Sequence, residues 1–368
     1  WPEGAFAFST WGEDLEGELY FGHARDTIPL VTLAQALDAT PDPPAWLSQT
    51  SAFSDLQNLV PSAAWLPYDL NQPFWSDGAV KQRWIALPAG GQIVFSENDN
   101  WVYPVGTVFM KHFDLPLDDA DPTLTTRLET RFMVHGENGW YGVTYRWNED
   151  QTDAAILTVS ESETYTIATS EPPPVPPEGG SREQVWAFPS RTDCVACHNA
   201  AAGGALGPRT HQINGEFFYP QPGIMDNQLA VWNRLEMLSP MLDPTAIPTF
   251  LRSVAQDDTT APLEDRARSY LDSNCSYCHR PETGNRATFD TRFTTPLGEQ
   301  GLINGVVVES FDLPDEAIIR PGCVNCSLLY HRLSTLGSAE MPPLAKNRVD
   351  TPGVALIQTW IESLEIIE

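Results

Sequence analysis

The sequence predicts a multidomain protein in which an antiparallel β-sandwich is followed by a mainly α-helical region. Its 368 residues exceed what one ordinary domain needs. Apolar and polar residues alternate with a period of two over much of 61–170. All six cysteines come after a proline-rich stretch, "SEPPPVPPEGG". We therefore expect an N-terminal wrapping segment, a β-sandwich, a semi-rigid linker and two cysteine-bearing domains, over 1–60, 61–170, 171–180, 181–260 and 261–368 respectively.

The composition is that of a folded and strongly acidic protein. Hydrophobic residues make up 42% of the chain, and 21 Lys and Arg stand against 49 Asp and Glu, for a net charge of −28. Such a surface repels nucleic acid and anionic lipid, and favours either plain solubility or docking with a basic partner. No run of about 18 apolar residues is present, so no membrane span is expected. The chain starts at Trp1, and its first residues do not have the pattern of a signal peptide. We expect that a signal peptide was removed or is not included in this sequence.

The strands of the β domain are predicted from alternation. In "TRLETRFMVH" one set of alternate residues is mainly apolar and the other mainly charged. The turn "HGENGW" then reverses the chain into "YGVTYRW", so we expect a hairpin with one buried face. Further strands are expected in "QRWIALP", "WVYPVGTVFMKHF" and "AAILTV".

Helices are predicted mainly in the second half of the chain. An apolar stripe in "PLEDRARSYLDSNC" predicts a helix that runs into Cys275. "DTPGVALIQTWIESL" predicts a C-terminal helix with Thr351 as N-cap and Pro352 at the first helical position. "DNQLAVWNRLEMLSP" predicts a third, and "IPLVTLAQAL" a helix within the N-terminal segment.

Two copies of Cys-x-x-Cys-His, "CVACH" and "CSYCH", are the strongest chemical signal. Two thiols at this spacing match the two porphyrin vinyl groups, and the adjacent imidazole reaches the iron. A zinc half-site or a redox-active dithiol is the alternative, but neither explains a histidine directly after both pairs. We therefore predict two covalently bound haem c groups, attached through Cys194, Cys197, Cys275 and Cys278, with His198 and His279 as proximal iron ligands.

The sixth iron ligands are predicted from residues downstream of each motif. Met341 in "SAEMPPLAKN", stiffened by two prolines, is the expected distal ligand of the second haem, with a core gap-filling role as the alternative. The first haem has several candidates, namely His211, Met225, Met237 and Met241, or it has an open iron.

The third pair, Cys323 and Cys326, is followed by Ser327, whose hydroxyl does not replace an imidazole on iron. Haem attachment implies export to the periplasm or the cell exterior, where nearby thiols oxidise. A disulfide between them is therefore predicted, with a redox-active dithiol as the alternative.

Acidic runs offer a further, weaker candidate site. Carboxylates in "DLPLDDADPT" and "WNEDQTDA" could hold calcium, although solvated turns explain them as well. The candidate ligands are Asp114, Asp118, Asp119, Asp150 and Asp153.

Several stretches resemble a bacterial family of secreted di-haem c-type cytochromes over about residues 60–365. They are "LPYDLNQPFWSDGAVKQRWIALP", "YPVGTVFMKHF", "RLETRFMVHGENGWYGVTYRWNEDQTDA", "CVACHNAAAGGALGPRTHQIN" and "RPGCVNCSLLYHRL" with "AEMPPL". The resemblance implies an N-terminal β domain, a cytochrome c-type di-haem region and Met341 as an axial ligand. Family members lack cysteines just before "SLLYHR", which favours an added disulfide, and His211 is outside the family pattern.

The expected function is single-electron transfer with redox partner proteins, basic ones among them, with the β domain as a docking or assembly module. One alternative is a di-haem peroxidase-like enzyme with an open first haem. The other is a self-assembling subunit of an extracellular multi-haem structure, or the electron-accepting partner of a dehydrogenase.

Overall fold

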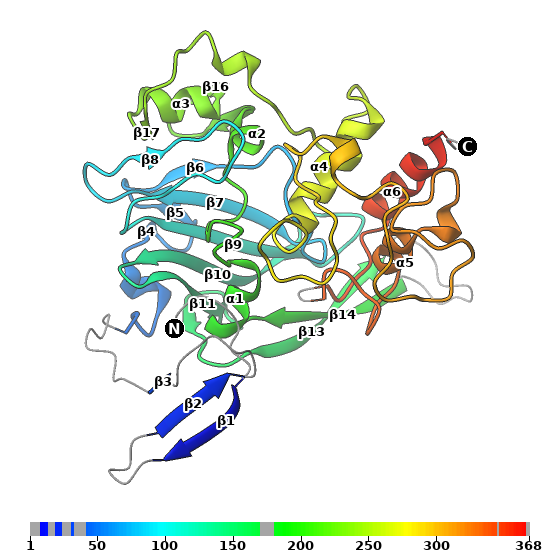
Figure 1. Cartoon of the computed structure of the whole chain (residues 1–368). Helices are drawn as coiled ribbons and strands as arrows, with labels where there is room; N and C mark the ends of the chain where they lie inside the picture. The colour runs from blue at the N-terminus through cyan, green and yellow to red at the C-terminus, as the bar shows by residue number, and fades with distance from the viewer. Residues whose placement is uncertain are drawn as a thin grey trace. The chain divides into compact units, whose positions relative to one another are not determined.

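The computed structural model of the chain describes residues 8–13, 19–23, 31–32, 42–169, 180–343 and 346–365 (Figure 1). The chain divides into two compact units, Trp1–Pro43 and Pro44–Glu368. In the first unit β2 (Leu19–His23) pairs antiparallel with β1 (Phe8–Glu13) and β3 (Val31–Thr32). The helix predicted in "IPLVTLAQAL" is wrong at Val31 and Thr32, and its other residues lie outside the described ranges.

A six-stranded antiparallel sheet organises the second unit, in the order β12-β11-β10-β9-β7-β6 (Figure 1). The predicted hairpin is confirmed, because Gly136 of one strand faces Gly139 of the next across the turn. The strands are β6 (Leu66–Tyr68), β7 (Val80–Ala86), β9 (Val108–Pro116), β10 (Thr125–Gly136), β11 (Gly139–Trp147) and β12 (Ala154–Ile156).

The other strands of this unit form two-stranded pairs. Within the described ranges the β domain is thus one six-stranded sheet with two-stranded additions, which confirms a β domain in this part of the chain. The pairs are β4 (Phe53–Asp55) with β5 (Val60–Pro61), β8 (Ile93–Val94) with β17 (Leu238–Ser239), β13 (Glu161–Thr169) with β14 (Gly180–Phe188), and β15 (Glu216–Tyr219) with β16 (Ile224–Asn227).

The predicted linker 171–180 falls between β13 and β14. Thr169 and Gly180 pair with each other at the ends of these antiparallel strands, and residues 170–179 lie outside the described ranges. The proline-rich stretch therefore connects two paired strands, where the sequence had suggested a junction between domains.

Both faces of the central sheet are covered. On one face Phe132 and Tyr145 belong to a buried cluster, and on the other Phe109 and Met133 pack in a cluster that contains Trp232. The expectation of a hairpin with a single buried face is therefore wrong, because the cysteine-bearing half of the chain packs on the face that was expected to meet water.

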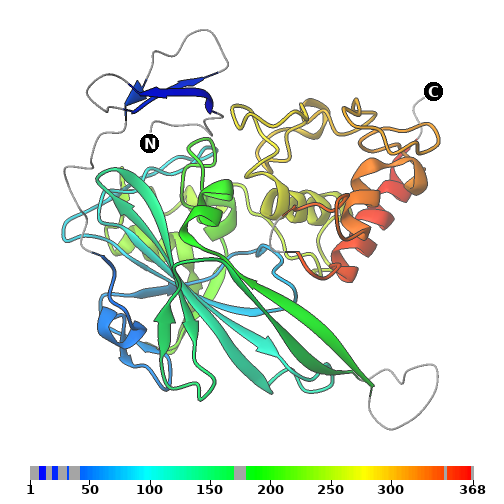
Figure 2. The ribbon, with the colours of Figure 1, turned by 90° about the horizontal axis from the view of Figure 1, so that it is seen from below.

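The helical part confirms the coarse prediction of a β domain plus a helical region. Helices α4, α5 and α6 lie together at one side of the sheet in both views (Figures 1 and 2). No helix among the described residues is long and apolar enough to cross a membrane. The helices are α1 (Arg191–Cys197), α2 (Thr210–Ile213), α3 (Gln228–Arg234), α4 (Leu263–Cys275), α5 (Leu328–Ser334) and α6 (Thr351–Ser363), with short 3-10 turns at Leu47–Thr50, Ile247–Thr249, Leu297–Glu299 and Val324–Cys326.

The C-terminal helix α6 forms as predicted, with one correction at its start. The N-cap is Asp350 and not Thr351, because the Asp350 carboxylate accepts a hydrogen bond from the Gly353 N–H at 3.1 Å. The apolar stripe of α6, with Trp360 at its centre, packs against Tyr270 of α4. This contact fixes the helix that leads into the second motif.

Candidate haem site

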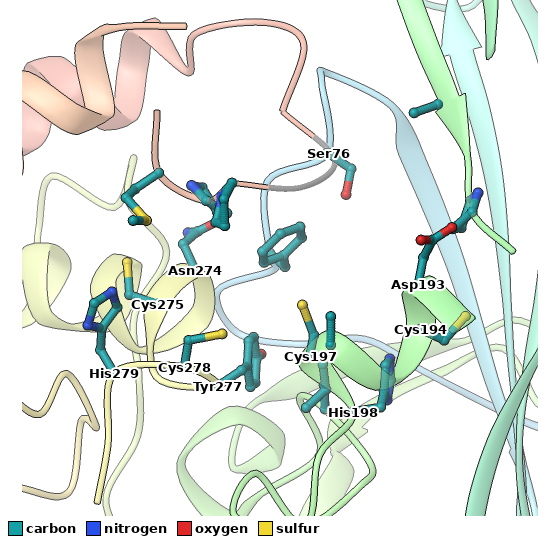
Figure 3. A pocket seen from close by; sticks show the side chains of 18 of the residues that line it. Ser76, Asp193, Cys194, Cys197, His198, Asn274, Cys275, Tyr277, Cys278 and His279 are labelled. Atoms are coloured by element: carbon teal, nitrogen blue, oxygen red, sulfur yellow. The ribbon is translucent and has the colours of Figure 1, made fainter. Parts of the chain in front are cut away.

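A cavity of about 720 Å³ is lined by both Cys-x-x-Cys-His motifs (Figure 3). Its volume lies within the range of about 300–1,000 Å³ that is usual for ligand and cofactor sites. Strands of the central sheet line it together with residues of the helical part. The predicted site residues that line it are Cys194, Cys197, His198, Cys275, Cys278, His279 and Met341.

The first motif lies on the short helix α1. Asp193 steadies the start of this helix, because its carboxylate accepts a hydrogen bond from the Ser190 N–H at 2.8 Å. Cys194 and Cys197 lie one turn apart on α1, and His198 is the C-cap. The helix thus presents both thiols and the imidazole to one cavity, as the attachment chemistry requires.

The orientation of His198 suits iron binding. Its Nδ1 lies 2.6 Å from the carbonyl oxygen of Gly204, the partner expected for an Nδ1–H donor. Nε2 then remains as the metal-binding nitrogen, the arrangement typical of metal-bound histidine. Burial lowers the pKa of His198 to about 3, so the imidazole is neutral at pH 7.

Gly204 makes this contact possible. Its φ is +71°, in the region that favours glycine, and a Cβ there would lie 2.0 Å from the Trp140 ring. A larger residue would push the loop off Trp140 and move the carbonyl that orients His198.

The second motif starts at the end of α4, as the sequence predicts. The His279 N–H donates to the Cys275 carbonyl at 2.8 Å, and the imidazole stacks on Phe289 with a centroid distance of 4.2 Å. Nδ1 of His279 lies 3.2 Å from Nδ2 of Asn285. Burial lowers the pKa of His279 to about 4, with a smaller contribution from the charge of Arg332, so this imidazole is also neutral.

The two motifs touch each other. The neighbouring thiol of Cys278, together with burial, raises the pKa of Cys197. The Asn199 amide also donates to the Tyr277 carbonyl at 3.2 Å. Figure 3 shows the labelled side chains of the two motifs side by side. Groups attached at these positions would therefore be neighbours.

Met341, Pro342 and Pro343 form a short segment, called here the Met341 strap. Hydrogen bonds at Met341 hold this segment in place. Its N–H donates to the Arg332 carbonyl at 3.1 Å. The buried ammonium of Lys346 lies 3.2 Å from the Met341 carbonyl and 2.8 Å from that of Leu333. Met341 shares the cavity with His279, which is a condition for the predicted axial pair.

The predicted distal ligands of the first haem lie elsewhere. Nε2 of His211, the atom that would bind iron, is 2.9 Å from the Asp272 carboxylate. Met225 and Met241 are each 60% exposed, and Met237 packs at the edge of a core cluster. None of these four residues lines the cavity.

The sheet residues that do line the cavity were not predicted from the sequence. Met110, Lys111 and Met133, with Arg83 and Arg131, come from the central strands β7, β9 and β10. The only available signal was the alternation in "TRLETRFMVH", which places Arg131 and Met133 on one face but does not say what covers that face.

Asp272 ties the first motif's region to α4. Its carboxylate is bound to His211 and accepts from the Phe293 N–H at 3.0 Å, and Arg209 lies 3.9 Å away. Burial alone would raise the pKa of Asp272, but His211 and Arg209 hold it well below its usual range. His211 is thus part of a buried polar network.

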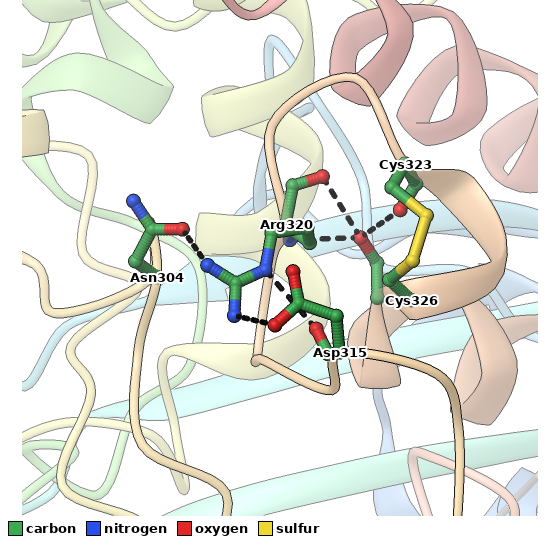
Figure 4. The surroundings of a disulfide bond; sticks show 6 residues. Asn304, Asp315, Arg320, Cys323 and Cys326 are labelled. Carbon is green, nitrogen blue, oxygen red and sulfur yellow. Dashed lines mark hydrogen bonds and ion pairs between the residues drawn. A yellow bond between two sulfur atoms is a disulfide. The ribbon is translucent and has the colours of Figure 1, made fainter. Parts of the chain in front are cut away.

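Cys323 and Cys326 form the predicted disulfide (Figure 4). Ser327, which replaces the histidine of a haem motif, accepts from the Arg320 N–H at 2.9 Å and donates to the Cys323 carbonyl at 2.8 Å. The Gly322 N–H donates to the Ile361 carbonyl at 2.9 Å, which attaches this loop to α6. None of these residues lines the cavity.

The carboxylates considered for calcium bind their own chain. Asp114 lies 3.2 Å from His112, Asp119 is paired with Arg182, and Asp118, Asp150 and Asp153 accept hydrogen bonds from nearby groups. In the described part of the chain, no three His, Cys, Asp or Glu side chains are grouped to hold a metal ion.

Comparison with known proteins found no relative of this chain. No family model, curated protein or solved structure matches the chain. The resemblance to di-haem cytochromes therefore remains a prediction from the motifs.

Proposed function

We propose that this protein is a di-haem c-type cytochrome that transfers single electrons in the periplasm or outside the cell. The observation that carries the proposal is that two Cys-x-x-Cys-His motifs, far apart in sequence, line one cavity together with Met341. Haem supplies the redox chemistry when bound. The chain supplies four thiols for attachment, two neutral imidazoles, and a mostly buried site that sets the potential.

Contact between the motifs supports electron exchange between the two groups. The Asn199 amide, next to His198 of the first motif, donates to the carbonyl of Tyr277, which lies within the second motif. Electrons entering at one haem could then leave from the other, so the protein would need only one docking surface for each redox partner.

A peroxidase-like enzyme is the second candidate, favoured by one observation. His211 and the three methionines considered as distal ligands of the first haem all lie outside the cavity. A first haem with an open position could bind peroxide, while the second haem supplied electrons.

The test is expression in a bacterial periplasm with haem-attachment machinery, followed by intact-mass measurement and spectroscopy. We expect two haems in the native chain, and one in a variant with Cys275→Ser and Cys278→Ser. Serine at both cysteines of the disulfide is the matched control and should leave two. A native chain without covalent haem refutes the proposal, and cyanide binding to the first haem would favour the enzyme over the carrier.

A further inference from the structure

Three cations stand side by side on the face of the central sheet that lines the cavity. In the register, Arg83 of β7 faces Lys111 of β9, and Lys111 faces Arg131 of β10. Directly opposed residues on neighbouring strands share a face, so the three side chains form a row, called here the cation row. All three line the cavity.

Such a row is unfavourable without anions. Like charges directly opposite each other destabilise a sheet, and partial burial increases the cost. Arg83 is paired with Asp69, and Arg131 with the buried Glu129. The ammonium of Lys111, in the middle, has no ion pair or hydrogen bond to any residue of the described ranges, and it lies 5.9 Å from the centroid of the Phe113 ring. One positive charge of the row is left without a counter-charge.

The cavity's own acids do not supply that charge. Each carboxylate in the lining is already engaged with another group. Asp77 accepts from the Asn347 and Arg348 N–H groups, Glu161 pairs with Arg146, Asp193 accepts from Ser190, and Glu309 pairs with Arg332. Burial, with Arg83 and Arg131 next to it, lowers the pKa of Lys111 to about 7, as expected for a cation that lacks an anion.

The row lies beside the first motif. Gly142 of β11 faces Met133 of β10, two residues along the same face from Arg131. The ideal Cβ position at Gly142 is 2.4 Å from Sγ of Cys194, so the first attachment cysteine rests directly on this face.

We propose that the cation row binds the carboxylates of the group held by the first motif, that is, the propionates of the first haem. This rests on the proposed function. A haem carries two propionates, and arginine and lysine are the side chains that bind carboxylates. In a chain of net charge −28, a row of cations inside a cavity selects for an anionic ligand.

The test uses the full-length holoprotein with Lys111→Gln, with Lys111→Arg as the conservative variant. Arg234→Gln removes an exposed cation outside the cavity lining and serves as the matched control. Haem content is measured by intact mass, the potential of each haem by spectroelectrochemical titration, and the propionates by infrared difference spectra between oxidised and reduced protein. Near-infrared magnetic circular dichroism identifies the iron ligands.

With Lys111→Gln we expect both haems to be attached, the propionate bands to shift, and the potential of the first haem to fall. A loss of positive charge favours the oxidised form by about threefold to tenfold, and tenfold corresponds to about 59 mV for one electron. Lys111→Arg should restore both readouts, and Arg234→Gln should leave them unchanged.

Unchanged bands and potential in Lys111→Gln would overturn the inference. A changed iron-ligand signature would overturn it too, because it would make Lys111 an iron ligand. If Lys111→Gln fails to fold, Lys111→Met, which also removes the charge, takes its place: native haem content with shifted propionate bands supports the inference, and unshifted bands oppose it. Failure of the proposed function is separate, because it appears as absence of haem from the native chain.

Discussion

Alanine at Gly142 should impair attachment of the first haem and leave the second intact. The new Cβ would lie 2.4 Å from Sγ and 2.9 Å from Cβ of Cys194, whereas ordinary contact begins at 3.4 Å. The sulfur must therefore move by about 1 Å, and neither neighbour yields easily, because one is strand backbone and the other a helix. Overpacking of this kind costs about 1–3 kcal/mol of folding free energy.

A displaced sulfur also misses the porphyrin vinyl group that it must reach. We expect a substantial fraction of the holoprotein to carry the first haem through Cys197 alone, while the second motif stays fully attached. Peptide mass spectrometry after proteolysis measures attachment at each cysteine, and the pyridine haemochrome spectrum distinguishes one thioether bond from two.

Gly298→Ala is the matched control for this experiment, because nothing lies within 4 Å of its ideal Cβ. It should give native attachment and a native Tm. Complete attachment at Cys194 in the Gly142 variant, with an unchanged Tm, would show that the first motif does not rest on β11 and would refute the proposed contact between this cysteine and the sheet.

Three further outcomes are expected. Lys346→Met should weaken the low-spin near-infrared signature of the second haem and lower the free energy of unfolding by about 1–3 kcal/mol, because the carbonyls of Leu333 and Met341 lose their donor. An unchanged signature would speak against Met341 as ligand. Asp272→Asn should cost about 3–5 kcal/mol at pH 7, since it leaves the buried Arg209 guanidinium without its anionic neighbour and removes the carboxylate bound to His211. The folded-state pKa of Asp272 lies below its unfolded value of about 3.9, so its contribution to the free energy of unfolding is present above that pH and is lost as the pH falls. In denaturant melts at decreasing pH, the variant should therefore lose stability less steeply than the native chain. An equally steep loss would contradict this assignment. Serine at both cysteines of the disulfide should cost no more than about 2 kcal/mol, given a sequence separation of 3, with two haems retained; loss of a haem would mean that this loop supports the site after all.

The parts of the site that are formed by residues close together in the sequence could be predicted from the sequence. The hairpin around "HGENGW", helix α4 and both attachment motifs follow from turn chemistry, helical periodicity and spacing within a few residues. The disulfide could also be predicted, because its cysteines are only three positions apart and the expected compartment is oxidising.

Long-range contacts account for what the sequence did not reveal. Alternation in β10 separates two faces but does not say that the second face, with Arg131 and Met133, meets the cavity and not water. The predicted distal ligands of the first haem all follow His198 in the chain, whereas Met133, a methionine that does line the cavity, lies on β10, which precedes His198. Such juxtapositions depend on which surfaces pack together, and spacing along the chain carries no information on that.

The shared cavity has a consequence for the order of assembly. Its walls come from strands near the start of the second unit, from two motifs in the middle, and from the Met341 strap near the end. The thiols of Cys194 and Cys275 are buried to the extent that their pKa values are raised, the latter to about 12. With haem as the ligand, as proposed, the attachment machinery would have to act while the chain is still open. Closure of the β sheet over the motifs would then follow loading, so that a chain exported without its cofactors would keep an unfilled interior.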